Sequence, residues 1–188
     1  MEDRQGERYV SRAALKLASA ADKLGLDFKD KTVLDVGSST GGFTDYVLKR
    51  GAAKVIAVEV GTEQLHPSLR TNSKVELHEK TDIRDFKMDA KPDIILIDVS
   101  FISLRQILPA VSEIASKNTQ IVAMIKPQFE TEPKDLNKGV IKNDSIRRQI
   151  FKDFESWAKN YFIIKTKADS QVSGAKGNLE RFYLLQKA

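Results

Sequence analysis

Short apolar runs alternate along the chain with stretches in which apolar residues recur every three or four positions. The runs predict buried strands, and the periodic stretches predict amphipathic helices. Strands are expected at residues 32–36, 54–60, 75–79, 92–98, 119–125, 161–167 and 181–186, and helices at 11–24, 42–50, 64–70, 104–116 and 145–160. This alternation is typical of βαβ units around a mostly parallel sheet. A charged connection, residues 127–143, precedes the last helix.

The first apolar run leads into residues 35–45, which read Asp-Val-Gly-Ser-Ser-Thr-Gly-Gly-Phe-Thr-Asp. An acid and three glycines are therefore expected at the carboxyl end of a buried strand, where open α/β sheets bind ligands. The spacing differs from the Gly-x-Gly-x-x-Gly expected for a dinucleotide pyrophosphate. It suits a nucleoside that carries a cationic amino-acid tail, which is S-adenosylmethionine.

Two further acids are expected near the ends of the second and third strands. Glu59 falls 22 residues after Gly37, a spacing at which an acid accepts hydrogen bonds from ribose hydroxyls. Asp82 is expected to accept from an adenine amino group, and Asp35 to face the ammonium or its water shell. The alternatives are turn-forming aspartates, a solvated strand end at Glu59 and a tight glycine turn without ligand. The predicted cofactor-binding residues are Asp35, Gly37, Ser38, Thr40, Gly41, Gly42, Phe43, Glu59, Asp82, Ile83 and Asp98.

The number and order of the expected strands favour a methyltransferase over a dehydrogenase. We expect an α/β, Rossmann-like fold of the S-adenosylmethionine-dependent methyltransferases. Its seven-stranded, mostly parallel sheet would carry helices on both faces and an antiparallel edge strand. A single domain is expected over residues 1–188, with residues 1–10 as an N-terminal extension.

A second set of polar residues closes the fourth and fifth strands. Asp98 ends the fourth strand, and Lys126 ends the fifth just before Pro127, which forces an extended exit. In the strand order of a methyltransferase, these two ends are neighbours. The alternative is an ordinary ion pair at a sheet edge.

Together with these residues, segments over nearly the whole chain resemble the TlyA/hemolysin A group of ribosomal RNA 2′-O-methyltransferases, within the FtsJ/RrmJ-like superfamily. The matching segments are residues 9–12, 15–17, 35–45, 97–104, 125–130 and 174–180. The resemblance implies a catalytic tetrad of Lys16, Asp98, Lys126 and Glu180. It also implies methyl transfer to a ribose 2′-hydroxyl, that of a cytidine, in ribosomal RNA.

The chain departs from the family pattern at three places. Ala13 and Ala14 stand where Gly-Gly is common, Glu59 stands where Asp usually ends the second strand, and Ala175 stands where Pro is common. Members usually carry a small basic S4-type RNA-binding domain ahead of this region. No S4 domain is expected in residues 1–188, so RNA affinity is expected to depend on other surfaces.

The implied reaction requires the hydroxyl proton to leave as the new bond forms. A lysine amine accepts a proton only when it is neutral, which burial or a second cation favours. Lys126 is expected to be the base or the charge stabiliser, oriented by Asp98. Glu180 is expected to orient Lys16 or the hydroxyl. The alternatives are a solvated helix face for Lys16 and an exposed strand position for Glu180.

Composition narrows the class of protein further. The 188 residues carry a net charge of +5, no cysteine and no apolar run of membrane-spanning length. Disulfides, thiolate metal sites and cysteine nucleophiles are excluded, and the two histidines are too separated to suggest a metal. The first eight residues lack a signal-peptide core, which favours the cytoplasm. The positive charge is compatible with a polyanionic partner, here ribosomal RNA or ribosomal subunits.

Basic residues are expected to approach the site from several sides, where phosphate contacts position a strand without reading its sequence. Phe101 and Phe129 follow two strand ends and are expected to stack a flipped nucleotide. The alternatives are core packing for the rings and plain solvation for the charges. The predicted RNA-binding residues are Arg12, Phe101, Phe129, Lys138, Arg147 and Lys176, with Arg4 and Arg8 on the same N-terminal approach as Arg12.

Competing functions predict other residues. Methylation of base amino groups usually requires an Asn/Asp-Pro-Pro-aromatic strand end, whereas residues 98–101 read Asp-Val-Ser-Phe. Carbon methylation of cytosine needs a cysteine. A hemolysin-like membrane-active protein would need an amphipathic or spanning apolar segment. A non-catalytic RNA-binding module would retain the basic surface without affinity for the cofactor.

Overall fold

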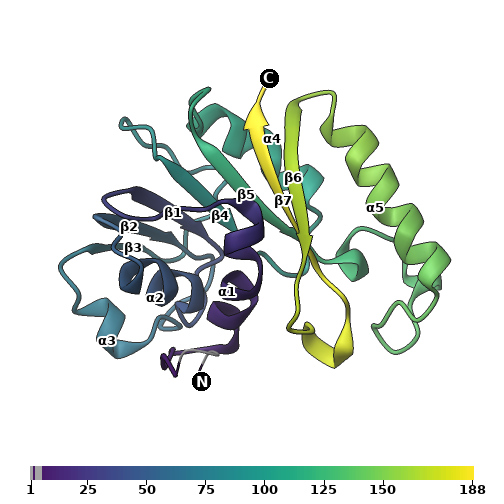
Figure 1. Cartoon of the computed structure of the whole chain (residues 1–188), viewed down its shortest axis with the longest axis horizontal. Coiled ribbons are helices and arrows are strands. Elements are labelled where there is room, and N and C mark those ends of the chain that lie inside the picture. Colours follow the sequence, from purple (N-terminus) through teal and green to yellow (C-terminus); the bar gives the residue numbers. More distant parts are fainter. Residues whose placement is uncertain (1, 3–5) are drawn as a thin grey trace.

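The computed structural model describes residue 2 and residues 6–188, apart from the Ala175 side chain, as one sheet flanked by helices (Figure 1). The strands are Thr32–Val36 (β1), Lys54–Val58 (β2), Val75–His78 (β3), Ile94–Ile97 (β4), Gln120–Ile125 (β5), Phe162–Asp169 (β6) and Arg181–Lys187 (β7). The α-helices are Arg12–Leu24 (α1), Gly42–Lys49 (α2), Pro67–Arg70 (α3), Leu104–Ile114 (α4) and Asp144–Ala158 (α5). Short 3₁₀ turns span Pro127–Phe129 (η1), Pro133–Asp135 (η2) and Ala175–Gly177 (η3).

The sheet has the strand order β3-β2-β1-β4-β5-β7-β6, which confirms the predicted fold class. Strands β1 to β5 pair in parallel, and β7 pairs antiparallel with both β5 and β6. The antiparallel pair lies at the edge, as predicted, with β6 outermost. Because β7 runs against β5, the amino end of β7 lies beside the carboxyl end of β5.

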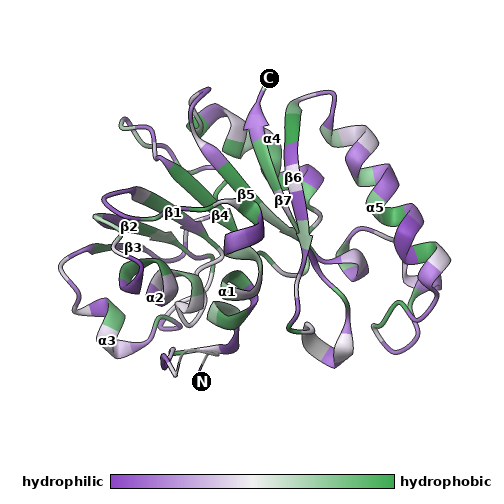
Figure 2. Cartoon of the chain, in the orientation of Figure 1, coloured by the Kyte–Doolittle hydropathy of each residue, from purple (hydrophilic) through white to green (hydrophobic). Residues whose placement is uncertain are grey.

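The core consists of two clusters, one on each face of the sheet. Residues such as Leu34 and Val36 pack against α4 and α5, whereas Val33 packs against α1 and α2. Strand β4 is buried along its whole length, which is typical of a parallel strand covered on both faces. Figure 2 shows the corresponding apolar colouring of the central strands. The sheet is therefore a rigid base for the residues at its edges.

Most predicted element boundaries differ from the observed ones by only a few residues. Gly25 ends α1 in the left-handed conformation, at φ 65°. Ser11 occupies the N-cap position of α1, but its hydroxyl makes no capping hydrogen bond. The helix predicted from residue 64 begins only at Pro67, because proline is favoured at the first helical position and His66 caps the turn.

Candidate active site

The carboxyl edge of the sheet gathers the polar residues that the sequence singles out. Asp35 lies in β1, Asp98 follows β4, Lys126 follows β5 and Glu180 precedes β7. Ile125 pairs with Arg181, so the next positions, 126 and 180, face each other across the β5–β7 pair. Helix α1 adds Lys16 from above this edge.

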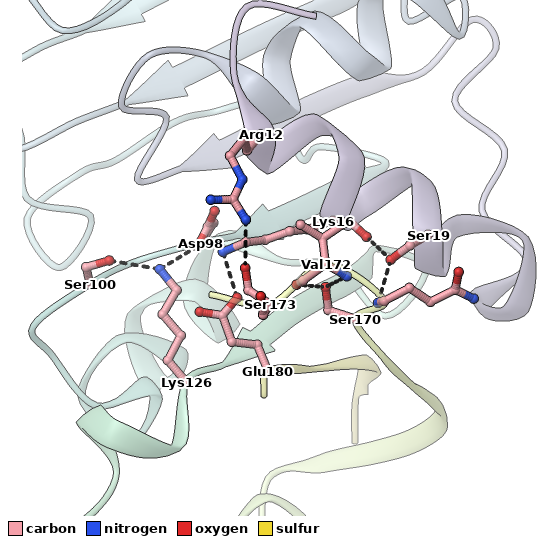
Figure 3. A network of polar contacts seen from close by, with 11 residues as sticks. Arg12, Lys16, Ser19, Asp98, Ser100, Lys126, Ser170, Val172, Ser173 and Glu180 are labelled. Carbon is pink, nitrogen blue, oxygen red and sulfur yellow. Dashed lines mark hydrogen bonds and ion pairs between the residues drawn. The ribbon is translucent and has the colours of Figure 1, made fainter. Parts of the chain in front are cut away.

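The four residues of the implied tetrad form two ion pairs (Figure 3). The Lys126 Nζ lies 2.6 Å from Asp98 Oδ1 and donates a 2.8 Å hydrogen bond to Ser100 Oγ. The Lys16 Nζ lies 2.7 Å from Glu180 Oε2. The side chains of Lys126 and Glu180 are 9% and 2% exposed. The structure thus brings the four together, and their catalytic role stays a prediction.

The side chains of these two ion pairs are largely buried, which distinguishes them from the solvated positions that the sequence left open. A buried ion pair loses hydration that its attraction only partly repays, so it is weak evidence for a stabilising role. Charged side chains that lose their hydration at a strand end are more typical of a functional site than of a stabilising ion pair. Neither a solvated helix face for Lys16 nor an exposed strand position for Glu180 fits the structure.

Two glycines leave room for the acidic members of these pairs. A Cβ on Gly174 would overlap the Glu180 carboxylate, and a Cβ on Gly37 would lie 2.9 Å from the backbone oxygen of Asp98. Gly37 also adopts φ +79°, which an L side chain rarely does. The glycine loop and the second set of polar residues therefore pack directly on each other.

Asp35 is a buried carboxyl group within β1. Its Oδ2 accepts a 2.6 Å hydrogen bond from Thr44 Oγ1, and within the described part of the chain its Oδ1 has no hydrogen-bond partner. Burial raises the pKa of Asp35 to about 7, helped by the nearby charges of Asp98 and Glu59 and opposed by the Thr44 bond. An unpartnered buried oxygen at a strand end is a ready acceptor for a cationic or donor ligand.

Glu59 is 8% exposed and holds the glycine loop in place. Its Oε2 accepts from the Ser39 N–H at 2.8 Å and its Oε1 from the Gly61 N–H at 2.9 Å. Ser39 itself adopts a positive φ of 47°. A carboxylate offers about four acceptor sites, so Glu59 retains capacity for a ribose hydroxyl. This burial disfavours the alternative that Glu59 is a solvated residue at a strand end.

Asp82 has the turn-forming role that the sequence left open. It accepts from the Arg84 N–H and forms a two-oxygen ion pair with the Arg84 side chain. That guanidinium lowers the pKa of Asp82. Contact with an adenine amino group stays a prediction for this residue.

The other predicted cofactor residues divide between loop and core. Gly41 adopts φ +94°, and a Cβ there would meet Leu65 and Leu69. The first-turn N–H groups of α2, which follow it, have no intrahelical acceptor. Three side chains in this set are largely buried: Ser38 within the loop, Phe43 against Phe182, and Ile83 in the core cluster that includes residues of α4. Thr40 accepts from the His66 N–H through its backbone oxygen.

Phe101 is the most exposed large apolar side chain described, at 91%. It follows Ser100 and adopts a positive φ of 65°, which is rare for an aromatic residue and is typically a functional or strained conformation. Its ring centroid lies 5.1 Å from that of Phe129. Core packing therefore does not explain Phe101.

The predicted RNA-binding cations lie on three segments around this edge. The Arg12 Nη2 donates to the Ser173 oxygen at 3.3 Å, and the Lys176 Nζ donates to the Lys138 oxygen at 3.3 Å. Arg147 is largely covered and pairs with Asp144 at 2.8 Å. Arg8 pairs with Glu2 at 2.6 Å, and Arg4 lies outside the described residues.

Sequence reasoning missed several residues that support the site. Ser100 binds Lys126, Thr44 binds Asp35, and Gly174 makes room for Glu180. Ser19 donates to the backbone oxygen of Lys16. Thr44, Ser100 and Gly174 lie within the segments that carry the family resemblance, whereas Ser19 lies outside all of them.

Two kinds of feature are absent from residue 2 and residues 6–188, which the structure describes. Within them, no helix is both long and apolar enough to cross a membrane. The same residues hold no group of three or more His, Cys, Asp or Glu side chains placed to bind a metal ion.

Comparison with known proteins places this geometry in a family. The model of the FtsJ-like methyltransferases matches residues 9–187. The chain is 45% identical to the 23S rRNA (cytidine-2′-O)-methyltransferase TlyA of Campylobacter jejuni, covering 96% of this chain and 72% of that protein. It is 40% identical to Hemolysin A of Brachyspira hyodysenteriae, covering 94% and 76%.

A solved structure agrees with these sequence matches. A hemolysin of Streptococcus thermophilus superposes with a TM-score of 0.92 at 37% identity, covering 99% of this chain and 70% of that one. Fold, strand order and sequence thus coincide over nearly the full length. The chain belongs to the FtsJ-like methyltransferase family, in its TlyA/hemolysin A group.

Proposed function

We propose that this protein transfers a methyl group from S-adenosylmethionine to a ribose 2′-hydroxyl of ribosomal RNA. The observation that carries the proposal is the pair of buried lysine–carboxylate contacts, Lys126–Asp98 and Lys16–Glu180, beside the glycine loop. The relative in C. jejuni, whose name specifies cytidine-2′-O methylation of 23S rRNA, supports ribosomal RNA as the substrate.

The residues around the glycine loop fit the methyl donor. Gly37 permits close backbone approach, Glu59 retains acceptor sites for ribose hydroxyls, and the free Oδ1 of Asp35 suits the ammonium end. When bound, S-adenosylmethionine supplies an electrophilic methyl carbon on a sulfonium. The chain's own task is then to orient the hydroxyl and to manage its proton.

Lys126 is best placed for that task. Its Nζ forms a 2.6 Å ion pair with Asp98 and donates to Ser100, which supports a charge-stabilising role at the 2′-oxygen. As the oxygen loses its proton, Lys126 passes one of its own protons to Asp98 and takes up the hydroxyl proton. Lysine thus stays an ammonium, the Asp98 carboxylate becomes neutral, and the pair gains one positive charge beside the reacting oxygen. Glu180 holds the Lys16 ammonium nearby, where it adds a second positive charge to the site.

The acceptor side of the site is open and aromatic. Phe101, with Phe129 beside it, offers a ring face on which an unstacked base can lie. Arg12 and Lys176 lie on segments that flank the tetrad. Such cations position a phosphate backbone without reading its sequence.

The decisive experiment is transfer of tritiated methyl from S-adenosylmethionine to isolated ribosomal subunits and to protein-free rRNA, followed by mapping of the modified nucleotide. We expect label on a ribose that resists alkaline cleavage at that position. Label on a base, or none on either RNA form, would contradict the proposal.

Replacement of Lys126 by alanine tests the assigned chemistry. We expect the methyl-transfer rate to fall about 10²–10⁴-fold, the usual contribution of a positioned proton-transfer group. Donor and RNA binding, measured by calorimetry, should stay close to wild type. Lys152→Ala, on the exposed face of α5, is the matched control and should keep full activity.

A further inference from the structure

One face of α1 is attached to the loop between β6 and β7, residues 170–180. Arg12, Lys16 and Ser19 are spaced by four and three residues, so their side chains share this face (Figure 3). Arg12 donates to the Ser173 oxygen, Lys16 pairs with Glu180, and Ser19 contacts Gln171. Each turn of the helix thus meets a different part of the loop.

The Ser19 hydroxyl makes two hydrogen bonds of different kinds. It donates to the backbone oxygen of Lys16 at 2.6 Å and accepts from the Gln171 N–H at 3.1 Å. The first bond is a local serine contact within the helix. The second crosses to the β6–β7 loop. Ser19 therefore joins the backbone of Lys16 to the loop that leads to Glu180.

These contacts close a ring around the Lys16–Glu180 ion pair. From Gln171 the chain passes to Ser170, whose N–H donates to the backbone oxygen of Glu180 at 3.0 Å. Ser170 also fixes the turn, because its hydroxyl donates to the Val172 oxygen at 2.7 Å and accepts from the Val172 N–H at 3.2 Å. Both ends of the ion pair are thereby attached to one hydrogen-bonded frame.

We propose that Ser19 is a positioning residue, which fixes the distance between the Lys16 ammonium and the Glu180 carboxylate through this ring. The proposal rests on the proposed function, in which that pair acts on the ribose hydroxyl. A lysine has a long, flexible side chain, so the position of its ammonium group depends on how well its backbone and its ion-pair partner are fixed. Without the hydroxyl, α1 keeps its apolar packing against β6 and β7, but the distance between the two charged groups is no longer fixed.

Three substitutions at Ser19 isolate the hydroxyl. Alanine removes it and favours the helix. Threonine and valine have the same shape, and only threonine keeps the hydroxyl. We expect Ser19→Ala and Ser19→Val to lower kcat about tenfold, the rate equivalent of one hydrogen bond, with KM for donor and RNA unchanged. Ser19→Thr should restore kcat to within about twofold of wild type.

Ser112→Ala on α4, which packs on the opposite face of the sheet, is the matched control and should leave kcat unchanged. Methyl transfer to ribosomal subunits by the wild type is measured first, because its absence would refute the proposed function rather than the role of Ser19. With an active wild type, full kcat in both Ser19→Ala and Ser19→Val would overturn the inference. Equal kcat values in Ser19→Thr and Ser19→Val would also overturn it. A change of kcat and KM together would do the same.

Discussion

At the scale of single residues, Asp35 is a buried carboxyl group whose surroundings disfavour its charge. Its carboxyl is fully buried, has one hydroxyl partner in Thr44 and lies near two other acids. These surroundings disfavour the charged form and bring the pKa to about 7. Under the proposed function, the ammonium of the donor beside Asp35 would favour the charged form of the carboxyl group.

Asp35→Asn should change how the free energy of unfolding depends on pH. The pKa is 3.8 in the unfolded chain and about 7 in the fold, so the fold binds this proton more tightly. Wild-type stability therefore falls as pH rises from about 4 to about 7, by roughly 4 kcal/mol in total. Asparagine cannot ionise, so the free energy of unfolding of the variant should rise relative to that of the wild type until about pH 7. Urea denaturation from pH 5 to 8 measures this difference.

Asp82→Asn provides a control of opposite sign. The Arg84 guanidinium lowers the pKa of Asp82, so its charge stabilises the fold at neutral pH and that contribution is lost in acid. This variant should be less stable than wild type at pH 7 and approach it at low pH. Parallel pH curves for wild type and Asp35→Asn would contradict the assignment for Asp35.

At the scale of elements, the β6–β7 loop determines where Glu180 lies. Its Asn178 side chain accepts from the Ile141 N–H at 3.2 Å and donates to the Gly139 oxygen at 3.0 Å. The long connection between β5 and α5 is thereby attached to the same loop. Two segments that look unrelated in the sequence thus form one wall of the site.

Gly174→Ala should damage this wall without unfolding the protein. The added methyl overlaps the Glu180 carboxylate, so the carboxylate must move, and the short Lys16–Glu180 contact is expected to be disturbed. Displacement by about 1 Å can cost roughly 100-fold in rate, and we expect a loss of about that size in methyl transfer with KM for the donor unchanged. Gly25→Asn is the control, because a Cβ there meets no atom within 4 Å and asparagine tolerates the left-handed conformation of Gly25, at φ 65°. Full activity in Gly174→Ala would contradict the role of Glu180.

Helix α5 offers a test of stability separate from catalysis. The Asn143 Oδ1 accepts from the N–H groups of Ser145 and Ile146 and caps the helix. Asn143→Ala should lower the free energy of unfolding by about 1 kcal/mol, the usual value of an N-cap. Asn143→Asp should restore it. A change in kcat with no change in stability would show that this cap serves the site instead.

At the scale of the whole molecule, the net charge of +5 favours association with RNA. We expect the RNA-binding constant to fall steeply as salt rises, by about 0.7 to 0.9 in log–log slope for each phosphate contacted. Lys138→Gln combined with Lys176→Gln should reduce that slope by about 1 to 2. Filter binding between 50 and 300 mM salt measures it, and an unchanged slope would exclude these two lysines from the RNA surface.

Local pattern was sufficient to predict the sheet and most helices. The predicted and observed bounds of β1 are the same, because a charged stretch precedes the apolar run and Gly37 follows it. The site was only partly predictable. Gly174 and Ser19 act through contacts with residues far away in the chain, and neither apolar periodicity nor a local motif encodes such a contact. Glu180 and Lys16 also meet across a long stretch of sequence, and they were predicted as site residues only because of the family resemblance.

The place of β7 also has a consequence for protein synthesis. The donor loop ends by residue 45, whereas β7 spans Arg181–Lys187 and inserts between β5 and β6 only when those residues are available. A ribosome therefore produces the glycine loop well before Glu180. During translation, the nascent chain therefore contains the glycine loop and Glu59 before it contains the carboxylate that pairs with Lys16. Under the proposed function, a nascent chain is expected to begin methyl transfer only after β7 has been made.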